Sequence, residues 1–181
     1  GRTVSLIEAE MNAGGGIITK SDLAGYRAKA RKPIHSTFRG HDIYGPPPPS
    51  SGGITLVLML NILENFDLRE SGRWSPQTLH LMIESMKRAY VERARYLGDS
   101  DFVKIPPKLV TKSYAKKLAS QIDLQKATPS DKLAGNIVLA AEGENTTHFS
   151  VIDKAGMAVS NTYTLEAGYG SRVVVRGAGF L

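Results

Sequence analysis

The sequence contains no cysteine. This absence excludes disulfide bonds, zinc sites built from thiolates and catalysis by a cysteine nucleophile, but it leaves the cellular compartment open. The chain also has no run of apolar residues long enough to cross a bilayer, and it begins at Gly1 without a basic and then apolar leader. We therefore expect a soluble chain with no membrane span, whose leader, where one exists, lies outside this sequence.

No segment concentrates charge of one sign. The chain carries 23 Lys and Arg against 17 Asp and Glu, a net charge of +6 that is spread along its length. A nucleic-acid-binding protein gathers basic side chains on one element beside aromatic or glycine-rich partners. Only Arg27, Lys29, Arg31 and Lys32 cluster here, and we interpret them as a solvated surface. The sequence thus predicts no nucleic-acid partner, and its 181 residues with 41% hydrophobic composition are typical of a globular domain.

The first half of the chain predicts short helices around one hairpin. Thr19 and Asp22 have the spacing of a capping box, in which side chains satisfy the free N–H groups at a helix start. We expect, in order, a helix that ends at Gly14-Gly15-Gly16, a short helix after Thr19, a hairpin of residues 33–38 and 41–44, and a buried helix over 54–66 that follows a rigid stretch of four prolines.

The second half begins with the clearest helix. Ser75 and Pro76 are typical of a helix start, Gly98 is typical of an end, and the apolar residues between them recur at helical spacing. We expect their Met and Tyr stripe to lie in the core. Glu92, Asp99 and Asp101 lack the spacing of a calcium loop, so we interpret them as helix-end and turn carboxylates and expect no metal. A short helix over 113–122 and an exposed loop over 125–145 should follow.

From Thr146 onward the hydrophobic period changes to two, which predicts a β-hairpin. Lys154, Ala155 and Gly156 fit a three-residue loop closed by a left-handed glycine. This loop pairs residues whose numbers sum to 310, so Thr146 stands opposite Thr164, His148 opposite Thr162, and Ser150 opposite Ser160. Hydroxyls and one imidazole then share one face. The plain alternative is an edge hairpin whose polar face is in water.

Two groups of motifs carry a family resemblance. The first surrounds the hairpin and comprises Asn145-Thr-Thr-His-Phe-Ser-Val-Ile-Asp153, Gly156, Thr162-Tyr-Thr164 and Gly170. The second precedes it and comprises Tyr26, Arg39-Gly40, Pro46-Pro-Pro-Pro-Ser-Ser-Gly-Gly53, Leu60-Asn-Ile-Leu-Glu64 and Tyr96-Leu-Gly-Asp-Ser-Asp-Phe102. Both groups resemble the gamma-glutamyltranspeptidase family in the same order. The resemblance runs from about Gly14 to Leu181, which is broader than a chance motif match.

The resemblance implies an α+β chain that forms part of the αββα sandwich of N-terminal-nucleophile hydrolases. Residues 1–145 would be the C-terminal part of a large subunit, mostly helical and ending in an exposed loop. Residues 146–181 would start a small subunit with the hairpin and the nucleophile. The precursor would cut itself between Asn145 and Thr146. Cleavage frees the α-amino group of Thr146, whose ordinary pKa of about 7.7–8.0 suits it as a base for the hydroxyl of the same residue.

The implied reaction is γ-glutamyl transfer or hydrolysis on glutathione and related compounds, with an amino acid, a peptide or water as acceptor and no cofactor. Thr146 and Thr164 would be the catalytic residues, the second orienting the hydroxyl of the first. Glu166 would take the α-ammonium group of the substrate; its alternative role is a solvated carboxylate at a strand end. For His148 we prefer a hydrogen-bonded strand residue over a general base.

The sequence also departs from the family pattern. It stops at Gly179-Phe180-Leu181, before the family's glycine pair for the oxyanion, and it lacks the segment with the arginine that holds the substrate carboxylate. We therefore expect an inactive internal fragment whose partners are the remainder of its own two subunits. By resemblance alone the protein would be periplasmic or secreted. The alternatives are a related acylase acting on β-lactam side chains, and a non-catalytic fragment or interaction domain.

Overall fold

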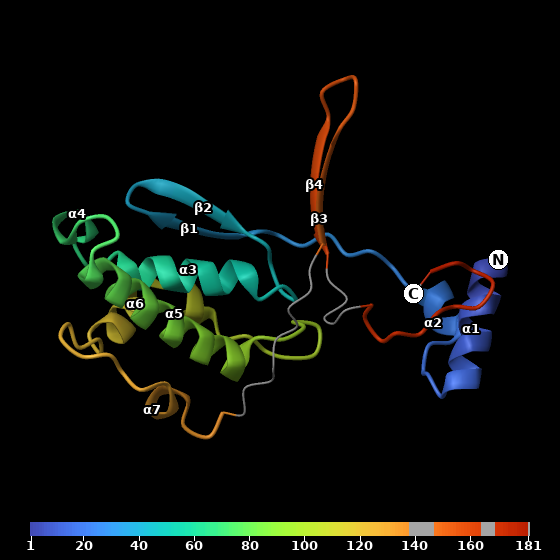
Figure 1. Cartoon of the computed structure of the whole chain (residues 1–181), viewed down its shortest axis with the longest axis horizontal. Helices are drawn as coiled ribbons and strands as arrows, with labels where there is room; N and C mark the ends of the chain where they lie inside the picture. Colours follow the sequence, from blue (N-terminus) through green and yellow to red (C-terminus); the bar gives the residue numbers. More distant parts are fainter. Residues whose placement is uncertain (138–146, 164–168, 181) are drawn as a thin grey trace. The chain divides into compact units, whose positions relative to one another are not determined.

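A computed structural model describes residues 1–137, 147–163 and 169–180. The chain divides into two compact units, one made of Gly1–Lys29 with Ala140–Leu181 and the other of Ala30–Leu139. Helices and antiparallel hairpins occur in the described residues, which confirms the α+β class (Figure 1).

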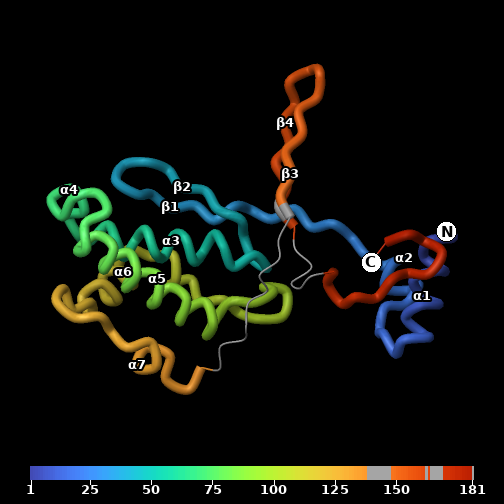
Figure 2. Tube along the Cα trace, viewed as in Figure 1, coloured from blue at the N-terminus to red at the C-terminus, as the bar shows by residue number. Residues whose placement is uncertain are grey.

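Helix α3 (Gly52–Leu63) is the centre of the unit formed by Ala30–Leu139. The hairpin of β1 (Ile34–Phe38) and β2 (His41–Gly45) packs against it, as do α5 (Pro76–Tyr96) and α6 (Lys112–Ala119), an arrangement that can be followed along the Cα trace (Figure 2). Because neighbours surround it, α3 is apolar nearly all round, as the sequence predicts. The core consists of Leu58, Ile62, Leu63, Leu81, Ala89, Ala115, Leu118, Ala119 and Ile122.

The chain enters α3 through a contact between two glycines. A Cβ atom on Gly45 would lie 2.7 Å from the Cα of Gly53, and a Cβ on Gly53 would lie 2.2 Å from the carbonyl oxygen of Pro46. Real Cβ atoms do not approach backbone this closely, so glycine is required on both sides. The end of β2 is thereby held against the first turn of α3.

Helix α5 has the predicted bounds but not the predicted buried face. It starts at the N-cap Ser75, whose side chain accepts a hydrogen bond from the Thr78 backbone, and it ends at Tyr96. The Met and Tyr stripe, expected in the core, is exposed, which corrects that prediction. The buried residues are instead Thr78, Leu81, Glu84, Ser85, Arg88, Ala89 and Glu92. Apolar spacing identified a helix face but did not show which face the rest of this unit covers.

Short helices occupy several connections of this unit: α4 (Leu68–Ser71), the 3-10 helix η1 (Pro107–Val110) and α7 (Ser130–Ala134). The sequence predicts a plain loop over 125–145. This prediction is wrong for Ser130–Ala134, which form the short helix α7 after Pro129. Residues 138–145 of that predicted loop lie outside the described residues. Helix α6 begins after its N-cap Thr111 and ends three residues before the predicted Ile122.

The other unit contains α1 (Arg2–Gly14), α2 (Lys20–Gly25) and the hairpin of β3 (Thr147–Ile152) and β4 (Ala158–Tyr163). Gly15 ends α1 with a left-handed φ of 71°, and the predicted capping box of Thr19 and Asp22 is formed in both directions. An ion pair of 2.8 Å between Glu10 and Arg176 ties α1 to the segment after the hairpin. The local turn signals of the sequence are therefore confirmed.

Candidate functional site

The β3–β4 hairpin has the predicted register. Its pairs run from Thr147 opposite Tyr163 to Ile152 opposite Ala158, so every paired sum is 310. The loop closes as expected, because Gly156 has a φ of 85° and its N–H donates to the Asp153 carbonyl oxygen at 3.0 Å. The Asp153 carboxylate then accepts from the backbone N–H groups of Ala155 and Met157, at 2.8 and 3.0 Å. This local bonding fixes which residues face each other along both strands.

The two faces of this hairpin differ in chemistry. His148 Nε2 lies 3.1 Å from the Ser160 hydroxyl and 3.3 Å from the Ser150 hydroxyl, so three polar side chains meet on one face. On the other face the rings of Phe149 and Tyr163 make an edge contact with centroids 6.4 Å apart. The prediction that His148 is a hydrogen-bonded strand residue is confirmed.

The residues predicted to carry the chemistry lie outside the described residues. These are Asn145 and Thr146 at the cleavage bond, Thr164 as the second catalytic residue and Glu166 as the substrate ligand. The described ladder ends one pair before them, at Thr147 and Tyr163. Their roles therefore stay predictions.

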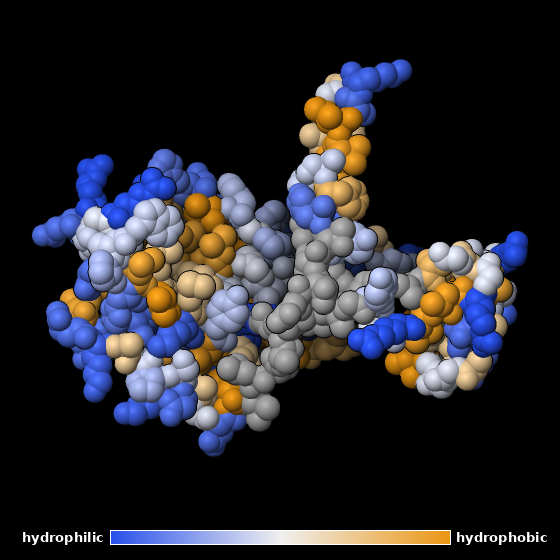
Figure 3. All heavy atoms as spheres, viewed as in Figure 1, coloured by the Kyte–Doolittle hydropathy of each residue, from blue (hydrophilic) through white to orange (hydrophobic). Residues whose placement is uncertain are grey.

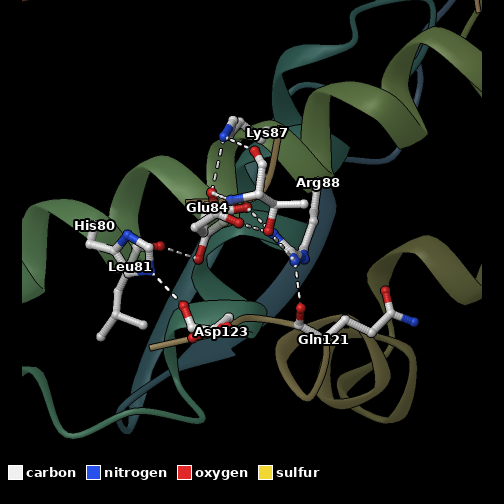
Figure 4. A network of polar contacts seen from close by, with 9 residues as sticks. His80, Leu81, Glu84, Lys87, Arg88, Gln121 and Asp123 are labelled. Carbon is white, nitrogen blue, oxygen red and sulfur yellow. Dashed lines mark hydrogen bonds and ion pairs between the residues drawn. The ribbon is translucent and has the colours of Figure 1, made fainter. Parts of the chain in front are cut away.

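The unit formed by Ala30–Leu139 contains a buried ionic network that the sequence reasoning missed (Figure 4). The Glu84 side chain is 1% exposed, and its oxygens lie 2.6 Å from Arg88 Nη1 and 3.0 Å from Lys87 Nζ. It also accepts from the Thr128 backbone N–H at 3.0 Å. Burial by itself would raise the pKa of Glu84, but the hydrogen bonds from Thr128, Arg88 and Lys87 outweigh it and lower that pKa to about 2.

The same network connects α5 to the segment that follows α6. Arg88 donates through Nη2 to the carbonyl oxygen of Gln121 at 2.8 Å, and Lys87 Nζ donates to the carbonyl oxygen of Thr128. His80 Nε2 lies 2.8 Å from the carbonyl oxygen of Asp123. An ionised carboxylate with three such donors is a poor general base, so we assign the network a structural role. Glu84 and Arg88 stand four residues apart on a helix, a spacing that already favours an ion pair.

The carboxylates near the end of α5 are also engaged. Glu92 is buried and accepts from the Tyr114 hydroxyl at 2.8 Å; burial and this carboxylate raise the pKa of Tyr114. Asp101 lies 2.7 Å from Arg31. Glu92 thus lies near the end of α5, as predicted, but it is buried and hydrogen-bonded, which the sequence did not indicate. Arg31 is partly exposed, as expected of a surface residue, and it is held in an ion pair. Within residues 1–137, 147–163 and 169–180, no group of three or more acidic or histidine side chains has the arrangement of a metal site.

One open groove lies in the unit of Ala30–Leu139, with a volume of about 590 Å³. Three cationic side chains line it, those of Arg31, Lys32 and Lys104, together with prolines such as Pro47 and Pro106. Arg31 is already paired with Asp101. The Ser100 hydroxyl at this groove accepts a hydrogen bond from Arg31 at 3.1 Å, and the lining residues include no carboxylate or histidine that could serve as its base, so we assign the groove no chemistry. No helix among the described residues combines the length and apolar character needed to span a bilayer.

Comparison with known proteins places the chain in a family. The family model described as gamma-glutamyltranspeptidase matches residues 1–181. The chain therefore belongs to the gamma-glutamyltranspeptidase family, and the resemblance inferred from its motifs is confirmed.

Its relatives include two kinds of proenzyme. The glutathione hydrolase proenzyme of Escherichia coli (strain K12) is 47% identical over 182 residues, which cover 100% of this chain and 31% of the relative. The acylase ACY 1 proenzyme of Pseudomonas sp. (strain SE83) is 40% identical over 172 residues, covering 94% of this chain and 30% of the relative. The chain thus spans about a third of the length of these curated relatives.

The solved structures that match the chain also include a gamma-glutamyltranspeptidase and an acylase. The gamma-glutamyltranspeptidase of Helicobacter pylori has a TM-score of 0.70 and 43% identity, over 80% of this chain and 42% of that one. The cephalosporin acylase of Bacillus halodurans has a TM-score of 0.78 and 26% identity, over 99% of this chain and 31% of that one.

Proposed function

We propose that these 181 residues are an internal part of a longer precursor that transfers or hydrolyses γ-glutamyl groups with Thr146 as its nucleophile. The observation that carries the proposal is the β3–β4 register, which agrees with the loop chemistry at every described pair and ends one position before Thr146. Family membership over the whole chain supplies the class of reaction. The name of the E. coli relative, a glutathione hydrolase proenzyme, supports glutathione as one substrate.

Continuing the ladder by one pair sets Thr146 opposite Thr164. Directly opposed residues of an antiparallel pair have Cβ atoms about 4.5–5.5 Å apart, which allows their hydroxyls to share a hydrogen bond. In this arrangement Thr164 orients the nucleophile. Glu166, two residues further along the same strand face, then binds the α-ammonium group of the substrate.

Self-cleavage follows from the chemistry of these residues. The Thr146 hydroxyl oxygen attacks the carbonyl carbon of Asn145, the peptide C–N bond breaks, and the nitrogen becomes the free α-amino group of Thr146. Water then opens the resulting ester and releases the Asn145 carboxylate. In the mature enzyme the same oxygen attacks the γ-glutamyl carbonyl carbon, and the α-amine takes the hydroxyl proton and passes it to the amine that leaves as the amide bond breaks. Water, an amino acid or a peptide then attacks the resulting ester, takes the γ-glutamyl group and restores the Thr146 hydroxyl.

The catalytic unit needs more than this chain. We propose that the two hairpins belong to the sheets of an αββα sandwich that the rest of the large and small subunits completes. A two-stranded hairpin is marginal by itself in water, and β3–β4 exposes Phe149, Val151 and Val159 on one face. The limited share of the relatives' length that the chain covers also supports this proposal.

A related acylase activity is a second candidate. Two observations favour it: the 40% identity to the acylase ACY 1 proenzyme and the structural match to a cephalosporin acylase over 99% of the chain. Both activities would use the same nucleophile chemistry, so they differ only in the substrate that the enzyme accepts. The two activities are separated by measuring the turnover of a β-lactam side-chain amide with and without added γ-glutamyl compounds. These compounds should not inhibit a dedicated acylase.

The test of the nucleophile uses the full-length precursor. Thr146→Ala removes the attacking oxygen and should leave one uncut chain. The matched control is Thr147→Ala, which changes the adjacent threonine and should still be cut. N-terminal sequencing of the unsubstituted small subunit should give Thr-Thr-His-Phe. A break elsewhere, or cutting that persists in the Thr146→Ala protein, contradicts the assignment; absence of any new terminus favours the non-catalytic alternative.

A further inference from the structure

Side chains of α5 hold the segment that follows α6 by its main chain. We call this segment, residues 121–133, the tail. Four of its carbonyl oxygens face side-chain nitrogen atoms of α5, in the pairs Gln121 with Arg88, Asp123 with His80, Thr128 with Lys87, and Leu133 with Arg95. In Figure 4 the side chains of Arg88 and His80 point from α5 to the first two of these residues. Every residue has a carbonyl oxygen, so this attachment does not depend on which side chains the tail carries.

The side chains of the tail contribute little to its attachment. Residues 123–127 and 129–132 are exposed, and polar side chains cover much of the surface around α7 (Figure 3). Ile122 is buried and Leu133 is half-buried. Because so few apolar side chains are buried, the hydrophobic contribution is small, and the hydrogen bonds to the main chain carry the attachment.

From Asp123 onward the tail follows α5 in one direction. Its partners on the helix move from His80 through Lys87 to Arg95. At 3.6 residues per turn the four donors fall within a sector of about 100°, and at 1.5 Å per residue His80 and Arg95 lie about 22 Å apart along the helix axis. One face of α5 therefore holds the tail over most of the length of the helix, and we call it the docking face.

The proposed cleavage changes how the tail is held. Before the cut, the polypeptide continues from both ends of the tail, and residues 134–145 lead to the Asn145–Thr146 bond. After the cut, only the connection through Gln121 remains covalent. Chain ends fray unless hydrogen bonds or burial tie them down, and a five-residue helix such as α7 is too short to be stable by itself. Retention of the tail then depends on the docking face.

We propose that the docking face keeps the tail bound after the cut, with Arg95 as the positioning residue at the end that is nearest the cleavage bond in sequence. The inference rests on the cleavage of the proposed function. Arg95 joins two elements, because its Nη1 lies 3.4 Å from Glu92 and its Nη2 donates to the Leu133 carbonyl oxygen at 3.2 Å. Its side chain is 40% exposed, so replacing it removes the contact to α7 and leaves the buried core in place.

Limited trypsin digestion of the full-length protein tests this proposal. Lys132 is the reporter, because it lies within α7 beside Leu133. The initial rate of cutting after Lys132 is measured by mass spectrometry relative to that after Lys116, an exposed residue of α6. A general loss of stability raises both rates, so their ratio reports on the tail alone. A free peptide of residues 112–145 gives the unprotected ratio.

Each protein is compared in an uncut and a cut form. Thr146→Ala supplies the uncut form and self-cleavage the cut one. Where self-cleavage does not occur, the proposed function has failed, and a site-specific protease sequence inserted after Asn145 supplies the same break. The variants are Arg95→Met, which removes the donor to Leu133, and Arg95→Lys, which keeps a cationic donor. Arg69→Met, at an exposed arginine of α4, is the matched control.

In both forms of the wild type, the ratio should stay on the order of a hundredfold below that of the peptide. In Arg95→Met it should rise on the order of tenfold when the chain is cut, whereas Arg95→Lys and Arg69→Met should behave like the wild type. A rise of that size on cutting the wild type overturns the proposal, because covalent continuity then holds the tail. An unchanged ratio in cut Arg95→Met also overturns it, as does an equal rise in Arg69→Met.

Discussion

Removing the Glu84 carboxylate should destabilise the protein more than any surface substitution. Glu84→Met keeps the approximate side-chain volume but leaves Arg88, whose side chain is 2% exposed, without its anionic partner at 2.6 Å. The Thr128 backbone N–H loses its acceptor as well. Removing one partner of a buried ion pair costs about 3–5 kcal/mol, because the remaining charge stays desolvated and unpaired.

The double variant Glu84→Met with Arg88→Met separates pairing from packing. Replacing a whole buried pair by apolar side chains is often close to neutral, so the double variant should recover much of the stability that Glu84→Met loses. Glu70→Met, at an exposed carboxylate of α4, is the control and should change the free energy of unfolding by about 0.5 kcal/mol or less. Urea unfolding followed by far-ultraviolet circular dichroism measures these three variants together with Arg88→Met, which completes the double-mutant cycle.

The pKa of Glu84 adds a pH dependence with a defined sign. Its folded value of about 2 lies below the ordinary 4.5, so the ionised group stabilises the fold above pH 4.5 and loses this contribution as the pH falls towards 2. The free energy of unfolding of the wild type, measured relative to that of the double variant, should therefore fall between pH 6 and pH 3. The reasoning is refuted if Glu84→Met costs less than about 1 kcal/mol, or if the double variant costs the sum of the two single ones.

Two further predictions concern catalysis. The isolated 181-residue chain should not turn over γ-glutamyl anilides, because each missing oxyanion donor costs about 10²–10³ in rate; measurable turnover would show that the substrate site is complete within it. In the full-length enzyme, Thr164→Ala should reduce kcat more than Thr162→Ala, since the register sets Thr162 opposite His148. Equal losses, or full activity in both variants, would contradict the continuation of the ladder to Thr146.

The sequence predicted best those features that short segments determine by themselves. The β3–β4 register follows from a three-residue loop and a period of two, and the structure has that register at every described pair. The capping box at Thr19 and the start of α5 after Ser75 are equally local. In each case the bonding partners stand within a few residues of one another, so no tertiary knowledge is needed.

Features that depend on distant partners were not predictable. Leu79 and Met86 are at helical spacing, but which face of α5 is buried depends on α3, on Tyr114 of α6 and on the residues around Thr128. Glu84 and Arg88 are four residues apart, which is typical of a surface pair, and only the fold shows that both are buried. The helix α7 is a single turn whose sequence resembles a loop. The assignments of Thr146, Thr164 and Glu166 stay predictions.

The contact between Gly45 and Gly53 limits how this part of the sequence can change during evolution. Most tight contacts tolerate a larger residue on one side when the other side becomes smaller. Here both positions already carry only hydrogen, and the atoms that a new Cβ would meet are backbone atoms, which no substitution can shorten. Neither glycine can therefore compensate for a change in the other. In a mutational scan the two positions should reject alanine independently, and no pair of substitutions should restore the approach of β2 to α3.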